Sequence, residues 1–109
     1  MIRNVGPQYM GSSAGNIYNP ASGVWGIIRV VHFCNESASD QTFYLYKGAS
    51  GGSTGGTTYF YGFTIKANST YDWPCYIEMG NSSYLTGYAS QASAVSITVS
   101  VDEDLTPAT

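Results

Sequence analysis

The chain has 109 residues, of which 10% are charged, and its net charge is −3. This length corresponds to one domain, and four basic residues are too few to form the positive patch that nucleic-acid binding requires. No apolar run reaches the roughly 18 residues that span a bilayer, and the 15% aromatic content argues against a disordered chain. We therefore expect neither nucleic acid nor membrane as a partner.

The beginning of the chain is rich in Gly, Ser, Asn and Pro, and residues 1–15 predict an extended arm. Residues 16–18 predict a short strand that ends at the Asn19-Pro20 turn. The chain closes on DEDLTPAT, which is typical of a solvated acidic tail. We therefore divide the chain into an N-terminal arm (residues 1–15), a β domain (residues 16–104) and a C-terminal tail (residues 105–109).

Residues 24–33, VWGIIRVVHF, form the strongest strand signal, because β-branched and aromatic side chains are dense there. Strict alternation puts Ile28, Val30 and His32 on one face and Trp25, Ile27, Arg29, Val31 and Phe33 on the other. Both faces are mainly apolar, so we expect the strand to be covered on both sides. Another subunit or the N-terminal arm would supply the second cover.

Further strands are expected over residues 42–47, 58–66, 70–79, 83–89 and 94–101. The Gly-rich residues 48–57 predict a loop at the tip of a hairpin, and Pro74 indicates an edge strand or a bulge. No window has helical periodicity. The sequence therefore predicts an all-β protein, an antiparallel β-sandwich or small jelly roll of six to eight strands.

Alternation along these strands assigns side chains to faces. Phe43 and Leu45 share one face of their strand, with Tyr44 and Tyr46 opposite. The other inward sets are Tyr59, Tyr61, Phe63 and Ile65; Tyr71, Trp73, Cys75, Ile77 and Met79; and Val95, Ile97, Val99 and Val101.

Residues that could carry chemistry are sparse. His32 is the single histidine, and the His32-x-Cys34 pair supplies at most half of a zinc site. The acidic run 102–104 could ligate calcium, but a solvated tail is the simpler interpretation. Cys34 and Cys75 are expected to be buried free thiols, with a single bridge as the alternative. We expect no catalytic residue, no cofactor and no metal, and hence no enzyme.

The ten tyrosines allow three interpretations. Tyrosines on a sheet can form a protein interface, an ordinary half-buried surface, or a platform on which sugars stack. The sugar platform would use Tyr59, Tyr61, Tyr76 and Tyr88.

Three pieces of the chain occur in a distinctive order between Gly26 and Asp104. They are IIRVVHFCNESASDQTFYLYKGA, FTIKANSTYDWPCYIEM and SSYLTGYASQASAVSITVSVDEDL. This pattern resembles a group of small bacteriophage proteins encoded among virion genes. The positions that carry the resemblance most are Asn35, Asn68, Tyr71, Asp72 and Trp73. Pro74-Cys75 departs from the pattern, and the N-terminal segment lies outside it.

The resemblance implies a structural component of a virion, assembled in the host cytoplasm. We expect a capsid decoration or minor capsid (cementing) protein that binds the major capsid protein or other virion proteins as a homo-oligomer, with the trimer as the expected state. Residues 1–15 would contact the shell or a neighbouring copy. The alternatives are a tail, neck or fibre component, or a carbohydrate-binding module. The residues expected at an interface are Ile2, Val5, Tyr9, Met10, Trp25, Arg29, His32, Tyr59 and Tyr61.

Overall fold

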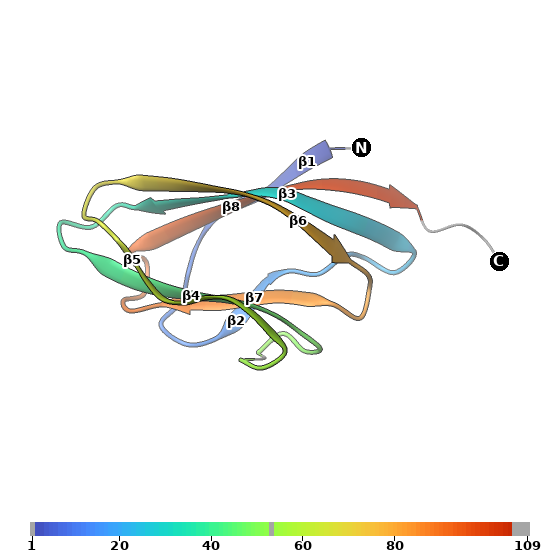
Figure 1. The fold of residues 1–109 in the computed structure, drawn as a ribbon, viewed down its shortest axis with the longest axis horizontal. Helices are drawn as coiled ribbons and strands as arrows, with labels where there is room; N and C mark the ends of the chain where they lie inside the picture. The colour runs from blue at the N-terminus through green and yellow to red at the C-terminus, as the bar shows by residue number, and fades with distance from the viewer. Residues whose placement is uncertain (1, 53, 106–109) are drawn as a thin grey trace.

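The structure is a computed structural model that describes residues 2–52 and 54–105. It contains eight β-strands, which Figure 1 shows as two layers. The strands are β1 (Ile2–Tyr9), β2 (Gly15–Tyr18), β3 (Val24–Asn35), β4 (Gln41–Gly48), β5 (Thr57–Ile65), β6 (Thr70–Met79), β7 (Tyr84–Ala89) and β8 (Val95–Leu105).

Sheet A has the strand order β1-β8-β3-β6, and sheet B has the order β2-β7-β4-β5. Every neighbouring pair is antiparallel. The chain passes between the layers at every connection except the β4–β5 hairpin. This order is that of an eight-stranded jelly roll, so the predicted antiparallel sandwich is confirmed.

The core lies between the sheets and follows the alternation expected for β8. Val95, Ile97, Val99 and Val101 are all fully buried. The stacked rings of Phe33 and Phe43 join the central strands β3 and β4, with centroids 4.1 Å apart. The rings packed around this pair come from β5 and β6: Phe60, Phe63, Tyr71 and Trp73.

A bulge in β3 changes the expected assignment of faces. The register shifts between Ile28 and Val30, so Arg29 is an extra residue in the strand. Ile28 therefore lies on the same inner face as Val31, and both are fully buried. The outward face of β3 is not covered by the N-terminal segment, because β1 lies in the same sheet.

Two register shifts in β5 likewise overturn its predicted alternation. Phe60 pairs with Leu45 and packs inward, although strict alternation places it outward. Tyr61 points away from the core and is 78% exposed, next to Gly62, whose φ of +67° suits glycine. Sequence periodicity fails here because each bulge reverses the faces of the residues that follow it.

The two ends of the chain also differ from expectation. The segment predicted as an arm is extended, but Ile2–Tyr9 forms the edge strand β1, and Met10 is buried in the core. The acidic residues 102–104 belong to β8 and not to a tail. Of the tail predicted over residues 105–109, Leu105 ends β8 and residues 106–109 lie outside the described part of the chain.

Asn35 is a fully buried polar side chain at the end of β3. Its Nδ2 donates to the carbonyl oxygens of Ser39 (2.9 Å) and Ile65 (3.0 Å). Its Oδ1 accepts from the backbone N–H (3.0 Å) and the hydroxyl (2.7 Å) of Ser37. The N–H of Asn68 donates to the Ser37 carbonyl at 3.1 Å, which joins the β5–β6 turn to the same junction. Asn35 and Asn68, two of the positions that carry the sequence resemblance, thus connect the turn after β3 to the β5–β6 turn.

We expect Asn35→Asp to lower the free energy of unfolding by about 3 kcal/mol, because it buries a charge and removes the donors that satisfy two carbonyls. Urea unfolding at neutral pH measures this change. Asn16→Asp is the matched control, since Asn16 is exposed, and its cost should stay within about 0.5 kcal/mol. Equal costs for the two variants would contradict a buried junction at Asn35.

Candidate binding surfaces

The residues expected at an interface are distributed over several parts of the molecule. The register places five of them on the outer face of sheet A: Ile2, Tyr9, Trp25, Arg29 and His32. Tyr61 lies on the outer face of sheet B. Val5 and Tyr59 pack against the core, and Met10 is buried within it. Of the nine residues expected at an interface, the structure thus gathers five on the outer face of sheet A, puts one on sheet B and places three in or against the core.

The outer face of sheet A carries exposed apolar side chains around the central strand. We call six residues the sheet A patch: Ile2, Trp25, Ile27, Arg29, Val30 and Tyr76. Ile2 is 69%, Tyr76 63% and Trp25 40% exposed. The Arg29 guanidinium lies 5.8 Å from the centroid of the Tyr76 ring. Exposed Trp, Tyr and Arg side chains are the types enriched at the centres of protein interfaces.

The outer face of sheet B carries a different group, which we call the tyrosine cluster: Tyr44, Tyr46, Tyr61 and Tyr88. The rings of Tyr44 and Tyr88 are stacked, with centroids 4.4 Å apart and planes 10° from parallel. Tyr61 meets Tyr44 edge-on at 5.1 Å. Tyr46 is buried beneath them; burial, followed by a hydrogen bond to Tyr88, raises the pKa of its hydroxyl to about 12.

The sugar platform expected from the sequence is only partly assembled. Tyr61 and Tyr88 share the outer face of sheet B, whereas Tyr76 lies on sheet A and Tyr59 packs against Trp73 in the interior. Sequence reasoning omitted Tyr44 from the platform. Its outward direction is evident from alternation with Phe43, but its stacking on Tyr88 depends on the pairing of β4 with β7.

A charged cluster closes one end of the sandwich. Glu103 accepts hydrogen bonds from the Arg3 guanidinium, one of them at 3.2 Å, and from the Tyr18 hydroxyl at 2.5 Å. The hydrogen bond from Arg3 is the main cause that lowers the pKa of the Glu103 carboxyl. Burial, and then the hydrogen bond to Glu103, raise the pKa of Tyr18. The cluster ties β1 to β8 and to the end of β2.

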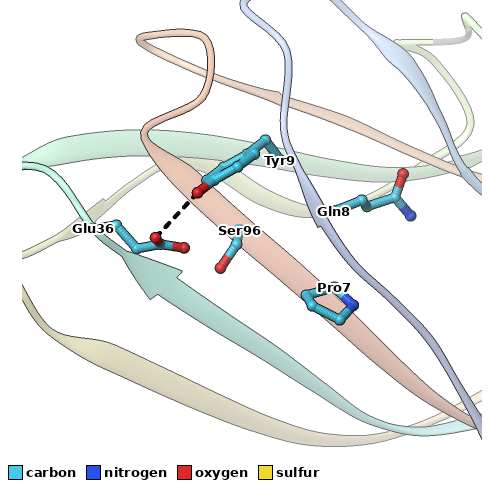
Figure 2. A pocket seen from close by; sticks show the side chains of 5 residues that line it. All are labelled: Pro7, Gln8, Tyr9, Glu36 and Ser96. Carbon is cyan, nitrogen blue, oxygen red and sulfur yellow. Dashed lines mark hydrogen bonds between the residues drawn. The ribbon is translucent and has the colours of Figure 1, made fainter.

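A shallow pocket of about 130 Å³ opens beside β1 and is lined by Pro7, Gln8, Tyr9, Glu36 and Ser96 (Figure 2). The Tyr9 hydroxyl donates to Oε1 of Glu36 at 3.1 Å. Ligand sites for drug-sized molecules begin at about 300 Å³, so this pocket is too small to enclose one. It holds one carboxylate, whereas acid–base hydrolysis of the glycosidase type uses two.

The single histidine and the two cysteines lie outside this pocket. His32 Nδ1 is bonded to Asp72 across β3 and β6 on the outer face of sheet A. Cys34 and Cys75 are free and half-buried, and burial raises the pKa of the Cys75 thiol to about 11. Within residues 2–52 and 54–105, no three His, Cys, Asp or Glu side chains gather closely enough to hold a metal ion. The same residues contain no helix with the length and apolarity needed to cross a bilayer.

Jelly rolls serve unrelated functions, including those of viral capsid domains and lectins. No family model, curated protein or solved structure matches this chain. The fold therefore assigns an architecture and not a family, and the function is inferred from the surfaces themselves.

All four sheet edges are shaped in ways that hinder strand addition. Pro7 and a register shift interrupt β1, and Pro74 with a register shift interrupts β6. Register shifts also interrupt β5, and β2 has only four residues. Association with another protein is therefore favoured through the faces of the sheets and disfavoured through their edges.

We expect Glu103→Gln to lower the free energy of unfolding by about 1 kcal/mol at neutral pH, since Arg3 is half exposed and solvent screens the pair. The pKa of Glu103 is lower in the folded state than its usual value of about 4.3. Its stabilising contribution is therefore complete above that pH and is lost as pH falls through the folded-state pKa. Urea unfolding of wild type and variant over an acidic pH series measures the difference, which should shrink on acidification.

The control for this prediction is Glu78→Gln, which removes an exposed carboxylate from β6. We expect it to change stability by less than about 0.5 kcal/mol at any of these pH values. A Glu103→Gln deficit that stays constant down to about pH 2 would contradict the assigned charge interaction.

Proposed function

We propose that this protein is a non-enzymatic structural component of a bacteriophage virion, a capsid decoration or minor capsid protein that binds the major capsid protein as a homotrimer. The sheet A patch is the surface proposed to make these contacts. The proposal rests on the sequence resemblance to small virion proteins together with one structural observation, the exposed apolar face of the central strand β3.

That observation is unusual for a central strand. Ile27 and Val30 face outward from the middle of sheet A and are only half-buried, and Trp25 and Tyr76 beside them are exposed. Apolar side chains grouped on a surface mark a binding site more often than single exposed ones do. The patch combines aliphatic side chains with Trp, Tyr and Arg, which is the composition of a protein-binding surface.

The protection of the sheet edges supports the same surface. Because strand addition is hindered at β1, β2, β5 and β6, a repeating assembly would use the faces. The low charge of the chain also limits repulsion between copies held close together on a shell. The jelly-roll topology supports the proposal by analogy, since viral capsid domains share it.

We expect the double variant Trp25→Ser with Tyr76→Ser to weaken binding to purified shells of the encoding phage by at least about tenfold, because it removes two aromatic side chains from the centre of the contact. Co-sedimentation with shells measures binding, and sedimentation equilibrium measures the oligomer. Tyr61→Ser is the matched control, since Tyr61 is at least as exposed but lies on sheet B.

Three outcomes would contradict the proposal. They are a wild-type protein that stays monomeric and does not sediment with shells, a double variant that binds like wild type, and equal losses for the double variant and the control. Cryo-EM of the particle places the protein directly: density on the shell supports decoration, and density in the tail, neck or fibre replaces that role with the alternative one.

A further inference from the structure

The outer face of sheet B is uncharged. Its four strands contain one charged residue, Lys47, and the Lys47 ammonium reaches across the sandwich to donate to the Glu78 carbonyl at 2.7 Å. The outward positions carry hydroxyl, amide or glycine residues. They are Asn16, Thr42, Tyr44, Tyr46, Gly48, Thr58, Tyr61, Gly62, Thr64, Tyr84, Thr86 and Tyr88, of which Tyr46 and Thr86 are buried.

The outer face of sheet B differs in composition from the sheet A patch, and the difference favours a different kind of ligand. Sheet A exposes aliphatic side chains such as Ile2, and elsewhere on the same face the Arg29 guanidinium lies over the Tyr76 ring. The outward positions of sheet B carry no aliphatic side chain larger than the methyl group of threonine, and each aromatic ring there bears a hydroxyl. A hydroxyl group that a contact buries needs a hydrogen-bond partner, because an unpaired one costs free energy. A ligand that itself presents hydroxyl groups would supply such partners.

The tyrosine cluster is also held rigid before any ligand binds. Tyr44 and Tyr88 hold each other by stacking, and the Tyr88 ring also stacks against the buried Tyr46, with centroids 6.4 Å apart. Gly62 lies under Tyr44, and a Cβ at Gly62 would come within 3.3 Å of the Tyr44 hydroxyl oxygen. Rings fixed in this way lose little side-chain entropy on binding, so more of the contact energy appears as affinity.

One side of the cluster has a raised border. The described residues of the β4–β5 connection, 49–52 and 54–56, lie on the side of sheet B that faces away from sheet A (Figure 1). The Cβ position at Gly51 in this connection is 3.3 Å from Cβ of Asn16 and 3.9 Å from Cδ2 of Tyr84. Tyr61, on the edge strand β5, remains open. A surface with one border and one open side suits an extended chain better than a small enclosed molecule.

We propose that the tyrosine cluster binds a neutral polysaccharide. The C–H face of a hexose ring would stack on the exposed ring of Tyr61, and the hydroxyls of Tyr44, Tyr88, Thr42 and Thr64 would hydrogen-bond its hydroxyl groups. The absence of a cation on this face argues against a polyanion. This site lies on the opposite sheet from the sheet A patch and does not depend on the proposed virion role.

The test is affinity electrophoresis of the full chain in gels that contain mannan, soluble glucan or xylan, with alginate as a polyanion. We expect at least one neutral polymer to retard the protein and alginate to have no effect. Tyr61→Ala should weaken the retarding interaction about fivefold to tenfold, because it removes the most exposed ring of the cluster. Tyr61→Phe should retain most of the binding.

The matched control is Tyr9→Ala, which removes an exposed tyrosine that lies on the other sheet and outside the sheet A patch. It should bind like wild type, and circular dichroism confirms that each variant is folded. The proposal is overturned if no neutral polymer retards the protein, if alginate retards it equally, or if the two alanine variants lose the same affinity. It is also overturned if Tyr61→Ala changes the sedimentation of the protein instead, which would make this face a contact between copies.

Discussion

The structure depends on the stacking of Phe33 on Phe43 between the central strands of the two sheets. Their centroids are 4.1 Å apart, closer than those of any other ring pair in the core. Around this pair the rings of β5 and β6 fill one half of the sandwich, while Val and Ile side chains from β8 fill the other. The sheets are therefore joined by side chains whose burial dominates stability, and the outer faces are left free to differ.

The outer faces of the two sheets differ in composition. The outer face of sheet A bears the apolar patch together with charged groups such as Arg29, Asp72 and Glu78, whereas sheet B presents hydroxyl groups and tyrosine rings. Blunted edges on both sheets disfavour lateral pairing. A thin two-layer protein of this kind can present two chemically distinct surfaces back to back, separated only by its core.

Alternation in the sequence was sufficient to find most of the strands and most of the core, because the inward positions of β4, β6 and β8 recur at every second residue. It failed in β3 and β5, where bulges at Arg29 and around Tyr61 reverse the faces, and no single residue type announces a bulge. Alternation also missed β1, because Gly6 and Pro7 are residue types that are rare in strands and because β1 pairs only with β8, which is distant in sequence. The tyrosine cluster required the β4–β7 pairing, which is a property of topology and not of local sequence.

The pairing of the first strand with the last has a consequence for how the protein is made. β8 lies between β1 and β3, so sheet A has no continuous ladder until the final residues of β8 are in place. On the ribosome, β1 and β3 would emerge long before their common partner. Folding is thus a late, whole-chain event dominated by contacts between residues far apart in sequence, a topology associated with slow folding. A prematurely terminated chain would expose the apolar inner face of β3 and would be a natural substrate for chaperones and proteases.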